Sequence, residues 1–193
     1  MATITLFQSV TLDGVLQSPG RPDEDPRDGF RHGGWAGPYA DEVSLRFGAE
    51  GMARDGALLF GRRTYTDVLR HWTTTSEPNP FTDVLLRTPK YVVTRSAATE
   101  PEFPATTLLA GDGVANVAAV KQQISGVLTI MGSGVLVRAL HAAGLIDDYL
   151  LLIHPIVLGS GRTLFGPGER RDLVLRRTEP TTTGVVVAHY AAH

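Results

Sequence analysis

Short apolar runs alternate with amphipathic segments along most of the chain. The apolar runs predict buried β-strands at residues 4–10, 57–61, 90–96, 106–110 and 127–131. Between these runs, apolar residues recur at helical spacing and predict helices over 39–54, from Gly61 to about His71, over 114–124 and from Val135 to Ala143. Strands that alternate with helices in this way indicate an α/β fold with a mostly parallel sheet.

The pattern changes near the C-terminus. A long apolar strand is predicted over 148–161, with an interruption at Pro155, which cannot donate a hydrogen bond to a sheet. Two more strands, near 172–179 and 184–190, are separated by a Thr-Thr-Thr-Gly turn and predict a hairpin. The sheet is therefore expected to finish with antiparallel strands.

Two stretches lack any periodicity, residues 17–38 and 73–89. The first is rich in Pro, Gly, Asp and Arg, and a loop of that length in a compact domain usually has a function. Trp35 near its end has two interpretations: it stacks on a flat ligand, or it anchors the loop to the body. No repeat or linker interrupts the chain, so residues 1–193 are expected to form one domain.

The junction after the strand at 127–131 is the strongest candidate for a ligand site. Gly132, Ser133 and Gly134 lead directly into a helix. Because glycine has no Cβ, backbone amides at such a helix start can approach a phosphate closely. The alternative is a glycine-rich corner with no ligand.

Two other strand ends carry groups suited to an anion. Gly61 is followed by Arg62, Arg63 and Thr64, and two arginines at a helix start oppose the helix dipole. The strand at 90–96 ends in Thr-Arg-Ser, which matches the donors that a phosphate monoester requires. Surface ion pairs and an ordinary strand end are the alternatives. One dinucleotide with an extra ribose phosphate would engage all three junctions, which favours NADPH over NADH.

Two carboxylates are candidate proton donors. Asp13 lies in a turn after the first strand, and Asp41 lies at the start of the helix predicted over 39–54. Each has a structural alternative, because Asp13 can cap its own turn and Asp41 can serve as a helix-start charge. His154 lies within an apolar strand and is interpreted as a structural histidine.

Composition excludes several classes of protein. The 193 residues are 42% hydrophobic and carry a formal charge of −2, so no broad basic surface for nucleic acid is expected. The chain has no cysteine, which excludes disulfides, thiolate metal sites and cysteine nucleophiles. No metal site is predicted. A signal peptide and an apolar span of about 18 residues are both lacking, so a cytoplasmic protein is expected.

The order of these motifs resembles the dihydrofolate reductase-like superfamily. The motifs are L-D-G after the first strand, G-R-R-T-Y, V-V-T-R-S, I-M-G-S-G, and D-D-Y-L-L-L-I-H-P-I-V-L-G-S-G-R-T-L-F. The chain is most similar to the C-terminal reductase domain of the riboflavin-biosynthesis deaminase-reductase and its stand-alone bacterial relatives. The resemblance implies a single-domain, three-layer fold with about eight mostly parallel strands, an antiparallel C-terminal hairpin and helices on both faces.

The resemblance also implies roles for individual residues. Those implied to contact NADPH are Ser9, Val10, Gly61, Arg62, Thr64, Thr94, Arg95, Ser96, Gly132, Ser133, Gly134, Val135 and Leu136. Asp13, Trp35 and Tyr39 would border the substrate. Homodimers are common in the family, and the apolar strand over 149–158 is a candidate interface.

The function implied is hydride transfer from NADPH to a small heterocyclic or ribosylaminopyrimidine-type substrate, as in 5-amino-6-(5-phosphoribosylamino)uracil reductase. Dihydrofolate reductase carries a lone carboxylate on its first helix, whereas this chain has adjacent Asp41 and Glu42 after an inserted loop. Two alternatives stay open: a non-catalytic dimeric nucleotide-binding module, and dihydrofolate reductase activity.

Overall fold

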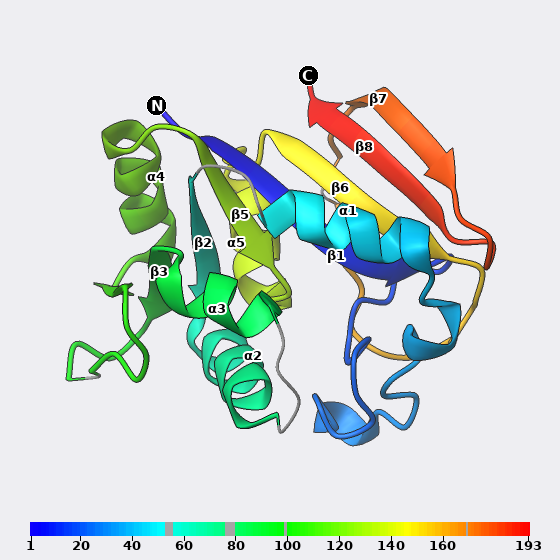
Figure 1. The fold of residues 1–193 in the computed structure, drawn as a ribbon. Helices are drawn as coiled ribbons and strands as arrows, with labels where there is room; N and C mark the ends of the chain where they lie inside the picture. Colours follow the sequence, from blue (N-terminus) through cyan, green and yellow to red (C-terminus); the bar gives the residue numbers. More distant parts are fainter. Residues whose placement is uncertain (53–55, 76–79, 99, 169) are drawn as a thin grey trace.

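A computed structural model describes residues 1–52, 56–75, 80–98, 100–168 and 170–193. Within these residues, one eight-stranded sheet has the order β4-β3-β2-β5-β1-β6-β8-β7 (Figure 1). The strands are β1 (Thr3–Thr11), β2 (Gly56–Gly61), β3 (Lys90–Thr94), β4 (Thr106–Ala110), β5 (Val127–Met131), β6 (Asp148–His154), β7 (Leu173–Pro180) and β8 (Val186–Ala192).

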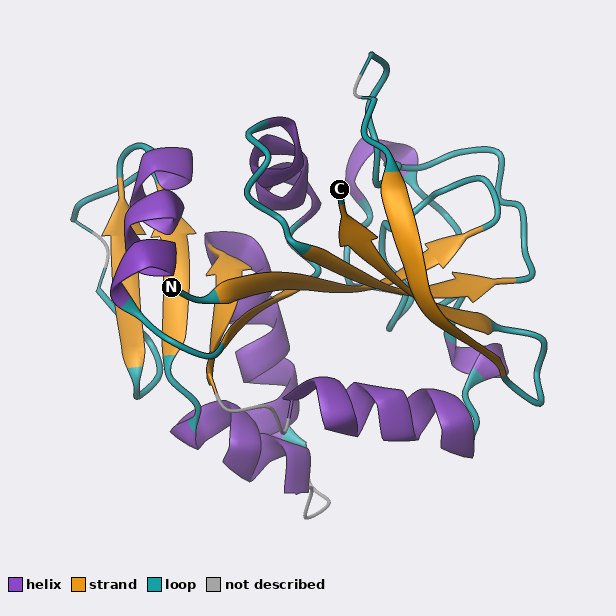
Figure 2. Ribbon diagram, turned by 90° about the horizontal axis from the view of Figure 1, so that it is seen from above, coloured by secondary structure: helices purple, strands orange, loops and turns teal. Residues whose placement is uncertain are grey.

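Helices connect most of the parallel strands. They are α1 (Glu42–Met52), α2 (Arg62–Thr74), α3 (Pro80–Arg87), α4 (Gly113–Gln123) and α5 (Gly134–Ala142), with two short 3₁₀ turns, η1 (Arg27–Gly29) and η2 (Gly37–Tyr39). Figure 2 shows helices on both sides of the twisted sheet. The predicted three-layer α/β architecture is therefore confirmed.

Strands β1 to β6 are all parallel, whereas β8 runs antiparallel to both β6 and β7. The predicted antiparallel finish is confirmed, with a turn at residues 181–184. Because parallel strands share a direction, the carboxyl ends of β1 to β6 lie at one edge of the sheet. Ligands of open α/β sheets bind at that edge, in the crevice where the strand order reverses.

The two faces of the sheet have separate apolar cores. On one face, Val117 of α4 and Leu140 of α5 pack against β1, β2 and β5. On the other, Leu69 of α2 and Leu85 of α3 pack against β2 and β3, and Phe47 of α1 packs against β6 and β8. β2 is buried on both sides, because Leu58 and Phe60 face one core and Leu59 faces the other. This continuous apolar run is typical of a central parallel strand.

The prediction of a loop over 73–89 was wrong in part, because residues 80–87 form the helix α3. Phe81 and Leu85 face the core beside α2, and Trp72 of α2 lies 4.9 Å from the Phe81 ring centroid. A proline at the first position suits a helix start. Because polar residues precede this eight-residue amphipathic helix, the sequence pattern did not indicate where it begins.

The prediction of one strand over 148–161 was also wrong in its length. β6 ends at His154, because Pro155 has no amide hydrogen to continue the sheet. β6 lies between β1 and β8, and Tyr149, Leu151 and Leu152 are buried within the chain. The β6 part of the candidate interface at 149–158 is therefore covered within the chain, whereas Val157 is exposed, and both the interface and the homodimer stay predictions.

Other boundaries shift by a few residues. The helix predicted over 39–54 begins at Glu42, since Tyr39 belongs to η2, and its predicted end at residues 53 and 54 lies outside the described residues. β3 ends at Thr94, so Arg95 and Ser96 lie beyond the strand. The helix α5 ends as predicted, with Gly144 at a φ of 71°.

Candidate active site

Two β-to-α junctions are joined by hydrogen bonds. The amide of Gly61, at the end of β2, donates to Oγ of Ser133 over 2.9 Å. The amide of Ser133 donates to Oγ1 of Thr64, in the first turn of α2, over 3.1 Å. Residues far apart in the chain thus form one continuous turn surface, which we call the junction cradle: residues 61–64 and 132–136.

The backbone of the cradle has an unusual conformation. Gly132 has a φ of 57° and Ser133 a φ of 58°, so two consecutive residues are left-handed. A Cβ added to Gly132 would lie 3.0 Å from Cγ2 of Thr64. A left-handed non-glycine residue is uncommon and costs about 1–2 kcal/mol, so the surrounding contacts hold Ser133 in place.

The start of α5 suits an anion. No side chain caps this helix, and its first bond runs from the amide of Val137 to the carbonyl of Ser133. The first amides of a helix have no partner within it, and the helix dipole favours negative charge there. Val135 is 75% exposed, so the helix start is open to solvent.

The third predicted junction lies next to the cradle. β3 is the neighbour of β2, and Val93 pairs with Gly61, which places Thr94 one residue beyond. Thr94 is buried and its Oγ1 accepts from the amide of Ser96 over 3.2 Å. Arg95 and Ser96 are exposed. The three predicted junctions therefore lie next to one another. β2 and β3 end side by side, and the turn after β5 is hydrogen-bonded to the end of β2.

Arg62 carries a buried donor that would fit an anionic ligand. Its guanidinium carbon lies 5.6 Å from the centroid of the Tyr65 ring, and its Nη1 is buried with no hydrogen-bond acceptor among the described residues. Such a donor is costly to leave unpaired, and a phosphate oxygen would pair with it. The residues present thus fit a phosphorylated dinucleotide.

The end of β1 lies on the other side of the cradle. Ser9 and Val10 pair with Leu152 and Ile153 of β6. Next to them Gln8 is buried, and its Oε1 has no hydrogen-bond partner in the described parts of the chain. The sequence reasoning overlooked Gln8; a polar residue within the apolar run of β1 was the available signal.

Asp13 fastens a turn to a distant loop. Its carboxylate accepts from Oγ1 of Thr11 at 2.5 Å and from the amides of Leu158 and Gly159 at 3.2 Å and 2.7 Å. These hydrogen bonds, the one from Thr11 first, lower the pKa of the Asp13 carboxyl. The contacts favour a structural role that joins the turn to residues 158–159, which differs in part from the predicted capping of its own turn, and a role in proton transfer stays a prediction.

Asp41 caps α1. One carboxylate oxygen accepts from the amide of Ser44 over 2.8 Å, and the other accepts from the amide and hydroxyl of Thr182. The bond from the Ser44 amide makes the largest contribution to lowering the pKa of Asp41 well below its usual range. Its catalytic role also stays a prediction, and the observed contacts favour the helix-start alternative.

Trp35 anchors the long loop. Its ring is buried, and Nε1 donates to the carbonyl of Gln17 over 2.7 Å. The ring meets His154 edge to face at 5.0 Å, and Tyr39 meets the same imidazole at 5.6 Å. His154 is buried, donates from Nδ1 to the carbonyl of Leu152, and has a pKa lowered by burial. It is therefore a structural residue that joins the loop to β6.

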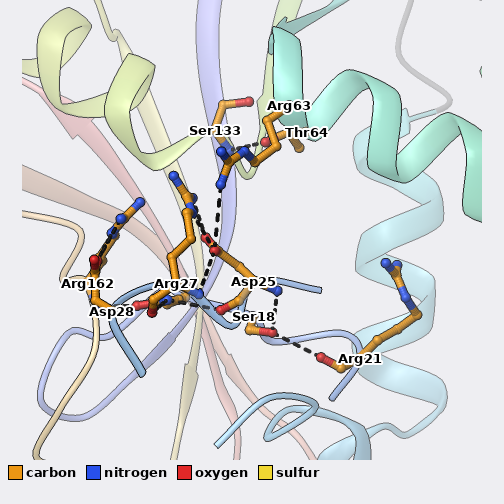
Figure 3. A network of polar contacts seen from close by, with 10 residues as sticks. Ser18, Arg21, Asp25, Arg27, Asp28, Arg63, Thr64, Ser133 and Arg162 are labelled. Atoms are coloured by element: carbon orange, nitrogen blue, oxygen red, sulfur yellow. Dashed lines mark hydrogen bonds and ion pairs between the residues drawn. The ribbon is translucent and has the colours of Figure 1, made fainter. Parts of the chain in front are cut away.

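A polar network holds the first half of that loop against the cradle (Figure 3). Asp25 binds Arg27 within the loop and lies 4.0 Å from Nη1 of Arg63. Arg162, from the turn after β6, binds Asp28 over 2.7 Å. A pocket of about 200 Å³ lies between η1 and residues 160–162, with Arg27 and Arg162 in its wall.

Two further properties bear on the class of site. Among the described side chains, no group of three or more His, Asp and Glu residues is arranged to hold a metal ion. No described helix combines the length and apolar character needed to cross a membrane.

Comparison with solved structures defines the class of fold. Dihydrofolate reductase from Enterococcus faecalis, in a complex with NADP(H), is 16% identical with a TM-score of 0.65, and the match covers 99% of this chain and 96% of that one. A pyrimidine reductase-like protein from Corynebacterium diphtheriae is 12% identical with a TM-score of 0.64, over 100% and 92% of the chains. The chain therefore has a dihydrofolate reductase-like fold.

The family is more specific. The model of the RibD C-terminal domain family matches residues 2–187, and the chain belongs to that family. A candidate riboflavin biosynthesis protein from Shewanella sp. PV-4 is 22% identical with a TM-score of 0.65, over 100% of this chain and 99% of that one. A comparison with curated proteins finds no match. Membership of this family supports an oxidoreductase with a pyrimidine reductase-like function. The solved structures support the fold.

Proposed function

We propose that this protein is an NADPH-dependent reductase of a small heterocyclic or ribosylaminopyrimidine-type substrate, in riboflavin biosynthesis or a related route. The observation that carries the proposal is the pair of hydrogen bonds joining Ser133 to Gly61 and Thr64. These bonds bring together the two junctions that sequence analysis assigned independently to a phosphorylated ligand.

The cradle would hold the diphosphate of the coenzyme. The open amides of α5 and the hydroxyl of Thr64 provide donors, and Nη1 of Arg62 is a buried donor that lacks an acceptor among the described residues. Thr94, Arg95 and Ser96, at the neighbouring strand end, would take the ribose 2′-phosphate. This phosphate distinguishes NADPH from NADH, and the preference depends on the Arg95 guanidinium.

The reaction needs a hydride and a proton. A bound nicotinamide supplies the hydride to a polarised C=N or C=O carbon. Ser9 and Val10, at the end of β1, would border the nicotinamide, and the Tyr39 and Trp35 segment would form the opposite wall of the substrate site. Asp13 and Asp41 both accept several hydrogen bonds, so an ordered water is the simpler proton source.

Two measurements test the proposal. Titration of the pure protein with NADPH should give saturable nicotinamide fluorescence at sub-millimolar cofactor, with weaker binding of NADH. Turnover of 5-amino-6-(5-phosphoribosylamino)uracil, followed by NADPH absorbance, should exceed turnover of dihydrofolate. An absence of saturable NADPH binding would rule out the reductase.

A non-catalytic nucleotide-binding module is the second candidate. The observation that favours it is that the carboxylates of both predicted proton donors are already bound by backbone amides. Binding of NADPH without oxidation, across pterins, pyrimidines and small carbonyl compounds, would support this candidate. The homodimer and the cytoplasmic location stay predictions, and sedimentation of the protein tests the first.

A further inference from the structure

Asp25 lies between two arginines. Its Oδ1 accepts from Nε of Arg27 over 2.5 Å, and Oδ2 accepts from Nη2 of the same guanidinium. On its other side, Nη1 of Arg63 is 4.0 Å from Oδ1. Figure 3 shows Arg27 and Arg63 reaching Asp25 from different elements, the loop and the start of α2. The carboxylate thus occupies a position where two guanidinium groups meet.

This position borders the junction cradle. Arg63 precedes Thr64, whose Oγ1 accepts from the Ser133 amide. The guanidinium groups of Arg27 and Arg63 are therefore tethered beside the turn that would hold a diphosphate. Arg162 pairs with Asp28 nearby, so a third guanidinium group adjoins the same part of the loop.

The loop backbone around Asp25 is held mainly by groups other than its carboxylate, which accepts one backbone hydrogen bond, from the Arg27 amide at 3.4 Å. The Asp25 amide donates to Oγ of Ser18 over 3.0 Å, and its carbonyl accepts from Nε2 of Gln17 over 3.0 Å. The carbonyl of Arg27 accepts from the same Nε2 at 3.0 Å. Both Gln17 and Ser18 are 3% exposed. The backbone is fixed by buried groups, so the carboxylate can leave the arginines without unfolding the loop.

The ion pair is suited to exchange. The side chains of Arg27 and Arg63 are 37% and 64% exposed, so a ligand can reach both guanidinium groups, whereas Asp25 is 17% exposed and binds Arg27 through both carboxylate oxygens. A phosphate offers more negative charge and more acceptor oxygens than a carboxylate and binds guanidinium bidentately. A diphosphate should therefore compete successfully with Asp25.

From this geometry we infer that Arg27 and Arg63 bind the diphosphate of the dinucleotide, and that Asp25 occupies them as a competing internal anion in the free protein. The inference rests on the proposed function, since it names two binding residues and a regulating carboxylate for the same cofactor site. Arg27, from the long loop, would then close over the bound diphosphate, and Asp25 would set the affinity.

Opposite effects of neighbouring substitutions test the inference. Removal of the competing charge in Asp25→Asn should lower the Kd for NADPH by about threefold to fivefold. Arg27→Gln and Arg63→Gln should each raise the Kd roughly tenfold. In the double variant Asp25→Asn/Arg27→Gln, the gain from Asp25→Asn should shrink. Nicotinamide fluorescence titration at fixed salt measures each value.

Asp23→Asn is the matched control, because Asp23 is 85% exposed and pairs with Arg21 in the same loop. It removes the same charge and should leave the Kd unchanged. An equal gain in Asp23→Asn would attribute the effect to net charge and overturn the inference. Weaker or unchanged binding by Asp25→Asn would overturn it as well, while NADPH binding by the wild type would leave the proposed function intact. An absence of NADPH binding by every variant would defeat both.

Discussion

At the scale of single residues, Asp13 and Asp41 share one arrangement. Both carboxylates accept hydrogen bonds from backbone amides of segments more than 130 residues away. Hydrogen bonds to the charged form favour ionisation, and the pKa of each carboxyl is lowered. A carboxyl that stays ionised near neutral pH is a poor proton donor, so these contacts favour a structural contribution, and the catalytic role of both residues stays a prediction.

Substitution at Asp41 separates the two roles. Asparagine is a good helix N-cap and keeps one acceptor oxygen, whereas alanine keeps none. We expect Asp41→Asn to retain turnover and most of the thermal stability, and Asp41→Ala to lower the Tm clearly. Steady-state kinetics and thermal unfolding measure the two effects. Loss of turnover in Asp41→Asn with an unchanged Tm would restore the catalytic role.

Acid should weaken the fold through the same groups. A carboxyl whose folded pKa lies below its unfolded value contributes stability that is complete above the unfolded pKa, near 3.9. That contribution is lost as the pH falls from about 4 through the lower folded pKa. The free energy of unfolding of Asp13→Asn should therefore vary less with pH below 4 than that of the wild type. Urea unfolding at pH 7, 4 and 3 checks the difference.

At the scale of elements, the contact between the β2-α2 and β5-α5 junctions depends on one hydroxyl. Ser133→Ala removes the acceptor of the Gly61 amide but keeps the strained backbone. We expect a loss of about 1–3 kcal/mol in the free energy of unfolding, together with weaker NADPH binding. Ser125→Ala, at an exposed serine before β5, is the control and should change neither value.

The end of α3 has a buried ammonium as its cap. Lys90 is 1% exposed, and Nζ donates to the carbonyls of Leu85 and Thr88 at 2.6 Å and 2.7 Å. Lys90→Met has a similar volume but leaves these carbonyls without that donor. We expect a loss of about 1–3 kcal/mol in the free energy of unfolding at neutral pH. Urea denaturation measures it, and an unchanged midpoint would contradict this role.

The same lysine gives a dependence on alkaline pH. Burial lowers the pKa of Lys90 to about 8 from the usual 10.5. Between these values the unfolded chain holds the proton and the folded protein does not. Stability should therefore rise with pH over this window, relative to the Lys90→Met variant. Urea midpoints of both proteins at pH 7.5, 9 and 10 provide the comparison.

Elements with strong periodicity were predictable, and contacts between distant elements were not. The strands β1 to β5 and the glycine turn before α5 follow from apolar runs and from Gly132 and Gly134. The helix α3 is short and follows a polar stretch, so its two apolar anchors were overlooked. The packing of Trp35 on His154 depends on where β6 ends, which a linear pattern does not specify. The hydrogen bonds of Asp13 and Asp41 depend on amides of Gly159 and Thr182, which lie more than 130 residues away in the chain.

At the scale of the whole molecule, the helices on both faces pack against the same sheet. We therefore expect the domain to unfold in one cooperative step. Trp35 reports on the region beside β6, and Trp72 packs with Phe81 beside β2 and β3. The single-tryptophan variants Trp72→Phe and Trp35→Phe should each show the same urea midpoint by fluorescence as by circular dichroism. NADPH at about 100 times its Kd should add about 2.7 kcal/mol to the stability of both. Separate fluorescence and circular dichroism midpoints would indicate two cooperative units.

The place of β1 in the sheet affects the order of events during synthesis on the ribosome. β1 precedes the other strands of the sheet in the chain, yet its two neighbours are β5, which ends at Met131, and β6, which ends at His154. Contacts of such long sequence separation form slowly. The nascent chain must therefore keep this strand unpaired until β5, which ends at Met131, about two thirds of the way along the 193 residues, has been translated. During that interval the apolar Ile4 and Leu6 would be available to chaperones.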